Sequence, residues 1–421
     1  MSLYNPQNPS ASIPPEIWLQ IFQTATYIPG EWDVSVTIPH TGLFTSWDLL
    51  QWKAYKVVLP LRRAIVQVSR LWWEVGTEVL YASFHETVLH GRIPTRALDH
   101  FERSLSSHPA LGRFVKRLAL LMSDSGQIDH VLQLCPNNLI LSFYHTPTPY
   151  HYTWEPVILT GHIRILDTSV LSFSQKEIVQ VLSSLANLEI LHLSRLDRGP
   201  EESRYHGTLR LSLVRLLRLS FQDLEGVEYW TPLLSTTDLP RLTAFSKNLG
   251  RGLLPFPIDI WRRITFFGCS IEIYDSLESE TFRSLTHLHL RDSVRPLRRQ
   301  QSRLPFHQLH QLTIANRSIS FTRVAEWKQI AEGCLELPLS RSEMPLLRVL
   351  ELEWGADGIG GNFVPISEYR QYLAFLKYLE SATLDFERLG VQFQEVYRKN
   401  IYRMPTPIKH VIKNVREEMR I

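Results

Sequence analysis

The chain has few cysteines and no C-x-x-C spacing. Its three cysteines, Cys135, Cys269 and Cys334, lie far apart in a sequence of 421 residues. This odd, scattered set excludes a disulfide framework and does not support a zinc knuckle. It favours a reducing compartment.

An excess of either charge and long apolar runs are also missing. Lys and Arg total 45 against 42 for Asp and Glu, so there is no global drive toward nucleic acid or anionic lipid. No stretch approaches the roughly 18 consecutive apolar residues of a membrane span, and the N-terminal MSLYNPQNPSAS lacks the basic and apolar regions of a signal peptide. We therefore expect an intracellular protein, cytoplasmic and/or nuclear, without a membrane partner.

Signatures of catalysis are absent as well. There is no G-x-S-x-G, H-E-x-x-H, EF-hand or kinase motif, so we expect no enzyme and no cofactor. His287-x-His289, followed by His307 and His310, could share a metal ion, but no nearby Cys or carboxylate set completes it. Exposed strand histidines are the favoured interpretation.

Ordinary globular usage, with 44% apolar and 21% charged residues, predicts a folded, soluble protein of two or three domains or one domain plus a repeat array. Residues 1–12, rich in Ser, Pro and Asn, predict a disordered arm. Apolar spacing predicts one short helix from Pro15 and a second helical unit from about Pro60 to Leu80. The stretch between them, about 28–59, is too apolar to stay solvated as an ordinary linker, and Ser46 could cap a short helix through about Val58.

Short apolar strands recur after about residue 94. Eight of the ten gaps between their anchors fall in the 20–29 residue window of leucine-rich repeats, and the best units read L-x-x-L-x-L. The anchors are Leu120, Leu141, Ile165, Leu193, Leu219, Ala244, Phe266, Leu290, Ile314, Leu352 and Phe386. Stacked units of this kind bury a continuous core.

These patterns predict an α/β protein in which an N-terminal all-α helical domain precedes an irregular leucine-rich-repeat-like α/β solenoid. The expected boundaries are 13–92 for the helical domain, 93–407 for the solenoid and 408–421 for a C-terminal helix. An unrelated α/β domain with a parallel sheet is the alternative, because alternating helices and strands fit it too.

Two motifs carry a family resemblance. Ile13-Pro14-Pro15-Glu16-Ile17, followed by Ile21-Phe22, resembles the opening L-P-x-E-[IL]-x-x-x-[IL]-[FL] signature of the F-box. Val66-x-Val68-Ser69-Arg70-x-Trp72 and then Leu80-Tyr81 look like its second half, with serine in place of the usual cysteine. The chain is most similar to the divergent F-box-like class common in higher fungi, with the stretch 28–59 as an insert between the halves.

The resemblance implies a non-catalytic substrate receptor of a Skp–cullin–F-box ubiquitin ligase. Its N-terminal helices would dock the Skp-type adaptor, and through it a cullin–RING ligase, while the repeat array would hold an unknown target protein. The adaptor surface would be formed or supported by Ile13, Pro14, Ile17, Ile21, Phe22, Val68, Trp72 and Leu80. The alternative is that these apolar residues only form the core of a small helical domain. The chain would then be a repeat scaffold that does not bind the adaptor.

In a solenoid, residues beside the inward pair of each strand face the concave surface, where such arrays bind partners. The predicted target-binding residues are Arg218, Arg263, His287, His289, Arg291, Glu351, Glu353, Asp385 and Glu387. They predict a basic-to-acidic gradient that would orient a charged partner. A solvated face with random charges is the alternative.

The segment from Arg291 to Arg303 contains five arginines and one aspartate. It could bind an acidic or phosphorylated peptide, or RNA, because guanidinium groups match carboxylate and phosphate oxygens. A solvated loop between repeats is the favoured interpretation.

Overall fold

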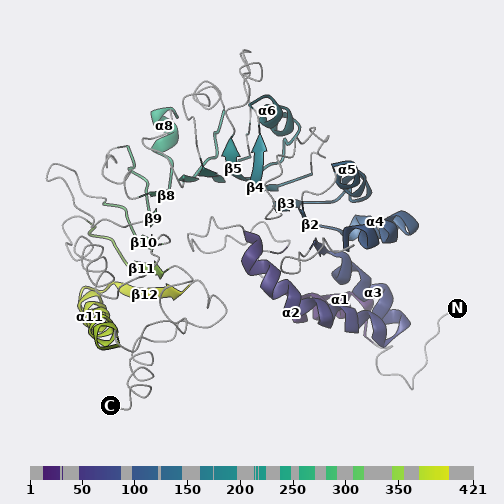
Figure 1. Ribbon diagram of the computed structural model, residues 1–421, viewed down its shortest axis with the longest axis horizontal. Helices are drawn as coiled ribbons and strands as arrows, with labels where there is room; N and C mark the ends of the chain where they lie inside the picture. The colour runs from purple at the N-terminus through teal and green to yellow at the C-terminus, as the bar shows by residue number, and fades with distance from the viewer. Residues whose placement is uncertain are drawn as a thin grey trace. The chain divides into compact units, whose positions relative to one another are not determined.

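The computed structural model describes residues 13–28, 31, 47–86, 97–121, 125–144, 162–173, 175–196, 213, 215–216, 218–223, 238–247, 256–270, 281–291, 307–316, 344–354 and 369–397. Two compact units divide the chain: Met1–Leu217 with Thr236–Arg241, and Arg218–Ser235 with Leu242–Ile421. Both combine helices with parallel strands (Figure 1), so the chain is a mixed α/β protein with a parallel-sheet solenoid.

Three helices open the first unit: α1 (Pro15–Ala25), α2 (Trp47–Val68) and α3 (Arg70–Tyr81). Pro15 occupies the first turn of α1, where a missing N–H removes no helical hydrogen bond. The predicted helical unit from about Pro60 to Leu80 is helical, but it consists of the end of α2 and most of α3 rather than one continuous helix. The chain breaks at Ser69, whose backbone is extended and whose Oγ accepts a hydrogen bond from the Trp72 N–H at 3.2 Å. A serine N-cap satisfies an otherwise orphaned helical donor, so the helix restarts there.

Helix α2 begins at Trp47, where the predicted short helix also begins, but it does not end near Val58 and continues through Pro60. Residues 47–59 of the predicted insert therefore form its first half. Proline inside a helix removes one backbone hydrogen bond and usually marks a boundary, which is why the sequence pattern placed an end near residue 58.

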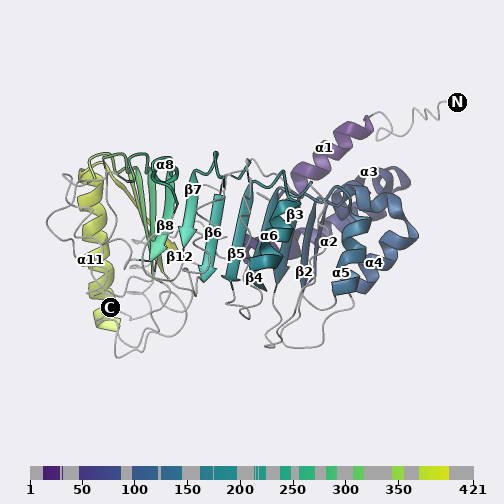
Figure 2. The ribbon, with the colours of Figure 1, turned by 90° about the horizontal axis from the view of Figure 1, so that it is seen from above.

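Five parallel strands follow chain order in the first unit. Their bounds are β1 (Ser83–His85), β2 (Arg117–Leu121), β3 (Ile140–Tyr144), β4 (Ile165–Phe173) and β5 (Ile190–Leu196). The connecting helices are α4 (Ala97–Ser107), the 3-10 helix η2 (Pro109–Phe114), α5 (Ser125–Leu134) and α6 (Gln175–Ser183). Helices α5 and α6 lie on the same side of these strands (Figures 1 and 2).

Seven parallel strands follow chain order in the second unit. They are β6 (Arg218–Asp223), β7 (Ala244–Lys247), β8 (Phe266–Ser270), β9 (His287–Arg291), β10 (Gln311–Asn316), β11 (Val349–Trp354) and β12 (Gln392–Tyr397). Its helices are α8 (Ile258–Trp261) and α11 (Tyr369–Arg388).

Rows of buried side chains hold the strands together. In the first unit Leu118, Leu141, Leu166 and Leu191 are in register and fully buried. In the second unit the equivalent row consists of Phe245, Phe267, Leu288, Leu312 and Leu350. Each row is one stripe of a period-two strand pattern, so each repeat completes the core of its neighbours.

Aromatic packing reinforces the second row. The indole of Trp261 lies 5.5 Å from Phe245, 5.8 Å from Phe267 and 5.4 Å from Phe282, measured between ring centroids. Edge-to-face contacts of this kind add to the free energy of burial. The short helix α8 therefore anchors β7 and β8.

Three predicted strand anchors lie on the opposite face of their strands from the other strand anchors. Ile165, Ala244 and Phe266 precede the true row members Leu166, Phe245 and Phe267. Ile140, Ile165 and Ile190 form a second buried cluster on the opposite face of the first unit's strands. When both faces of a parallel sheet are buried, a strand reads as a continuous apolar run, and alternation no longer reveals register.

The last predicted anchor, Phe386, does not lie in a strand. Phe386 is buried in helix α11, and the strand that follows β11 in the sheet is β12, whose Phe393 pairs with Leu350. The predicted arm 1–12, the C-terminal helix 408–421 and the body of the Arg291–Arg303 run lie outside the described residues. Within the described part of the chain, no helix is long and apolar enough to cross a membrane.

Candidate protein-binding surfaces

The N-terminal helices share a small aromatic core. Phe22, Ile65 and Val79 are buried, one from each helix, with Trp18 and Trp72 packed against them. The Trp72 ring lies 4.8 Å from Trp18 and 4.8 Å from Phe22. Both halves of the F-box-like pattern therefore contribute to one core.

Close approach of α2 and α3 depends on Gly76. A Cβ at this position would lie 2.8 Å from Ile65 Cγ2 and 3.2 Å from Val66 Cγ1. Both distances are shorter than ordinary van der Waals contact, so a larger residue requires the Ile65 and Val66 side chains, or the helices themselves, to shift.

A buried ion pair ties the segment after α1 to α2. Arg62 Nη1 and Nη2 donate to Glu31 Oε1 and Oε2 at 2.7 and 2.5 Å, and Nη2 also donates to the Thr26 carbonyl at 2.9 Å. The side chains are 0% and 1% exposed. The sequence analysis missed this pair, because nothing in the spacing of two charges 31 residues apart signals a contact.

Exposed apolar side chains concentrate on these helices. Of the ten large exposed apolar residues in the described part of the chain, seven lie between residues 17 and 73. On α1, Ile17 and Ile21 are 43% and 44% exposed and one helical turn apart. On α2, Val57, Leu61 and Val68 are exposed at spacings of four and seven, which places them on one stripe.

The predicted adaptor residues thus separate into two groups. Pro14, Ile17, Ile21 and Val68 are exposed and available to a partner. Phe22 is buried in the core, whereas Ile13, Trp72 and Leu80 are half-buried. The second group can support a surface but cannot form its centre.

Several predicted target-binding residues lie on one face of the second unit's strands. His287, His289 and Arg291 alternate with the buried Leu288 and Leu290 on β9. His289, Thr313 and Glu351 are in register on β9, β10 and β11. The Thr313 hydroxyl donates to Glu351 Oε2 at 2.8 Å.

This row is buried rather than open. His289 is 0% exposed and Glu351 is 7% exposed. The first unit has an equivalent buried row, Ser142, Asp167 and His192, on β3, β4 and β5. Polar residues at alternate positions of β3, β4 and β5 are the sequence signal for this buried row. Placing the β4 anchor at Ile165 instead of Leu166 obscured that alternation.

The remaining target-binding predictions have mixed outcomes. Arg218 lies half-buried on β6, and burial lowers the pKa of its guanidinium from the ordinary value. Arg263 lies exposed in the turn after α8, not on a strand, because β8 begins only at Phe266. Asp385 and Glu387 lie on helix α11, so the acidic end of the predicted gradient loses two of its four members. Glu353 is on β11, as expected.

The histidine cluster shows no metal-binding arrangement. His307 is exposed and His310 half-buried in the turn before β10, and Thr286 Oγ1 lies 2.7 Å from His287 Nδ1. Within the described ranges, no three His, Cys, Asp or Glu side chains are placed to hold a metal ion.

Comparison with known proteins adds no assignment. No family model matches the chain, and no curated protein matches it. Two features stand out: the exposed apolar stripes on α1 and α2, and the parallel strand array.

Proposed function

We propose that the protein is a non-catalytic substrate-recognition subunit of a Skp–cullin–F-box ubiquitin ligase. The N-terminal helices would dock the Skp-type adaptor, and the solenoid would bind the protein to be ubiquitylated. The observation that carries this proposal is the exposed pair Ile17 and Ile21 on α1, at positions where the sequence resembles the F-box.

Physical chemistry favours a protein partner for this surface. An exposed apolar stripe rimmed by polar residues is typical of an interaction site. Phe22 and Trp72 are already used in the core, so Ile17 and Ile21 are not needed to complete it. Their exposure leaves apolar area that a docked adaptor would remove from water.

Co-expression of the full chain with a Skp-type adaptor, followed by gel filtration, tests the proposal. The wild-type chain should co-elute with the adaptor, and Ile17→Glu should not, because an unpaired carboxylate would be buried in an apolar interface. Ile258→Glu is the matched control, since Ile258 is exposed to a similar degree on α8 of the other unit.

Circular dichroism must show that both variants are folded. If folded wild-type chain does not co-elute with the adaptor, or if Ile17→Glu co-elutes as well as Ile258→Glu, the receptor function is contradicted. That outcome would favour the alternative function, a repeat scaffold that does not bind the adaptor.

A further inference from the structure

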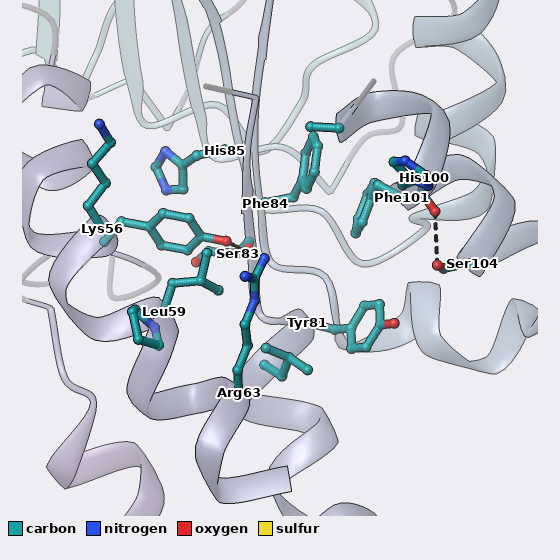
Figure 3. Close-up of a pocket in the computed structure, with 14 residues that line it drawn as sticks. Lys56, Leu59, Arg63, Tyr81, Ser83, Phe84, His85, His100, Phe101 and Ser104 are labelled. Carbon is teal, nitrogen blue, oxygen red and sulfur yellow. Dashed lines mark hydrogen bonds between the residues drawn. The ribbon is translucent and has the colours of Figure 1, made fainter. Parts of the chain in front are cut away.

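A cavity of about 850 Å³ lies in the first unit between α2, β1 and α4 (Figure 3). Its volume is within the range of pockets that bind small organic ligands. Helix α2 forms one wall, the face of α4 that carries Ala97, Phe101 and Ser104 forms the other, and β1 lies between them. Of the predicted adaptor residues only Leu80 lines it.

The α4 side of the cavity is aromatic. The rings of Phe84 and Phe101 stack 4.0 Å apart with an interplanar angle of 13°, and Tyr81 lies 6.3 Å from Phe101 at 24°. Rings stacked on one another cover each other's inner faces, so their outer faces and edges supply the apolar surface. Such a surface suits a flat or aromatic ligand, which can stack or pack edge-on.

The α2 side is basic. Lys56 and Arg63, two helical turns apart, line the cavity with Leu59 and Pro60 between them. Among the described residues that line the cavity there is no aspartate or glutamate. Arg63 is exposed and has no carboxylate partner in the described part of the chain. The electrostatic balance of the lining therefore favours an anion.

His85 supplies an unsatisfied polar group beside this wall. Its side chain lines the cavity from β1 and extends toward Lys56, with its ring 4.3 Å from that of Tyr55 (Figure 3). Neither ring nitrogen has a hydrogen-bond partner among the described residues, although both are buried. A buried polar atom without a partner is destabilising, and a ligand group that reached it would relieve that penalty.

The backbone edge of β1 is better suited to a compact ligand than to an added peptide strand. The Ala82 carbonyl accepts from Arg117 N and Glu86 N donates to the Ala119 carbonyl, so Ser83 and His85 direct their backbone groups away from β2. The Tyr55 hydroxyl already donates to the Ser83 carbonyl at 3.2 Å. Tyr55 thus covers the edge that a peptide would need for pairing.

We infer that this cavity binds a small organic anion with a flat apolar body. The body would pack against Phe84, Phe101 and Tyr81. Its carboxylate, sulfonate or phosphate group would face Lys56 and Arg63 at the α2 wall. This site is separate from the exposed part of the predicted adaptor surface, because the side chains of Ile17, Ile21 and Val68 do not line it.

Two probes of matched shape test the inference: 2-naphthoate, which is anionic, and 2-naphthamide, which is neutral. Isothermal titration of the full chain should show one naphthoate site and at least about fivefold weaker binding of the amide, a difference of about 1 kcal/mol. Arg63→Gln should weaken naphthoate binding about fivefold and change amide binding by less than twofold. Ala97→Trp should abolish binding of both, because the indole would occupy the cavity.

Controls separate this site from other surfaces. Arg262→Gln removes an exposed arginine of the second unit, and Ile17→Glu disrupts the apolar stripe of α1; both should bind naphthoate as the wild type does. The inference is overturned if the folded wild-type chain binds no naphthoate, or if binding survives Ala97→Trp. Equal binding of naphthoate and naphthamide would overturn the anion specificity. Loss of binding in Ile17→Glu but not in Ala97→Trp would place the probe on the α1 stripe instead.

Discussion

The ring of Trp72 on α3 lies 4.8 Å from the ring of Phe22 on α1, and the two meet at 61°. This contact joins the two halves of the F-box-like pattern, between which lie the segment after α1 and most of α2. The pattern residues therefore divide by role: Phe22 and Trp72 hold the helices together, and Ile17 and Ile21 remain at the surface.

Removing the Phe22 ring should destabilise the helical core. Phe22→Ala should lower the free energy of unfolding by about 3–5 kcal/mol, through lost apolar burial and the cavity left behind. Ile17→Ala, at a side chain 43% exposed, should change it by less than about 1 kcal/mol. Urea denaturation followed by tryptophan fluorescence measures both. Equal losses in the two variants would contradict the division of roles.

Gly112 tolerates no side chain. A Cβ there would lie 1.8 Å from the backbone oxygen of Leu134, and backbone cannot rotate away as a side chain can. Gly112→Ala should therefore cost about 3 kcal/mol or more. Gly76→Ala should cost less, about 1–3 kcal/mol, because its nearest neighbour is the Ile65 side chain. The ranking can be checked by thermal unfolding, and a reversed order would show that the η2 backbone yields more readily than the α2–α3 contact.

The Arg62–Glu31 pair should behave as a buried ion pair. Glu31→Gln leaves the fully buried guanidinium without its counter-charge and should cost about 3–5 kcal/mol. The double variant Glu31→Leu with Arg62→Met removes both charges and should recover much of that loss. Denaturant titration of the three proteins provides the comparison. A double variant at least as unstable as Glu31→Gln would argue against coupling between the two side chains.

Stability should fall in mild acid because of His85. Burial, followed by the charges of Arg117 and Arg62, holds the pKa of His85 well below its ordinary value of 6.5. Below about pH 6.5 the His85 side chain therefore binds a proton in the unfolded chain but not in the folded chain. The stability that is present above that pH is lost as the pH falls toward the folded pKa. His85 alone contributes a loss of about 1 kcal/mol between pH 7 and pH 5.5.

The comparison for this prediction uses His85→Gln, which does not titrate in that range, and His100→Gln, which alters an exposed histidine at the same cavity. The pH-dependent loss should shrink in His85→Gln and persist in His100→Gln. If both variants keep the wild-type pH profile, His85 is not the group responsible.

Local sequence patterns predicted the kinds of elements better than their register. The period of the anchors correctly indicated stacked parallel strands, because each repeat places apolar residues at the same point of a strand. Register failed at Ile165 and Phe266, where both strand faces are apolar. Phe386 was misassigned to a strand because a buried helix residue and a buried strand residue look alike in a short apolar run.

The candidate surfaces were predictable only in part. The exposure of Ile17 and Ile21 follows from helical spacing, since the two lie one turn apart while Phe22 faces the core. The burial of His289 and Glu351 could not be read from their strands, because it depends on what packs over that face. The same holds for the Arg62–Glu31 pair and for the cavity beside β1, which bring together residues from distant parts of the chain.

Affinity of the full-length chain for a purified Skp-type adaptor is the most direct test of the proposed function. Titration calorimetry should give a one-to-one complex with wild type and with Ile258→Glu, and binding at least tenfold weaker with Ile21→Glu, a loss of about 1.4 kcal/mol or more. No heat of binding with folded wild type, or equal affinities for Ile21→Glu and Ile258→Glu, would contradict adaptor docking through α1.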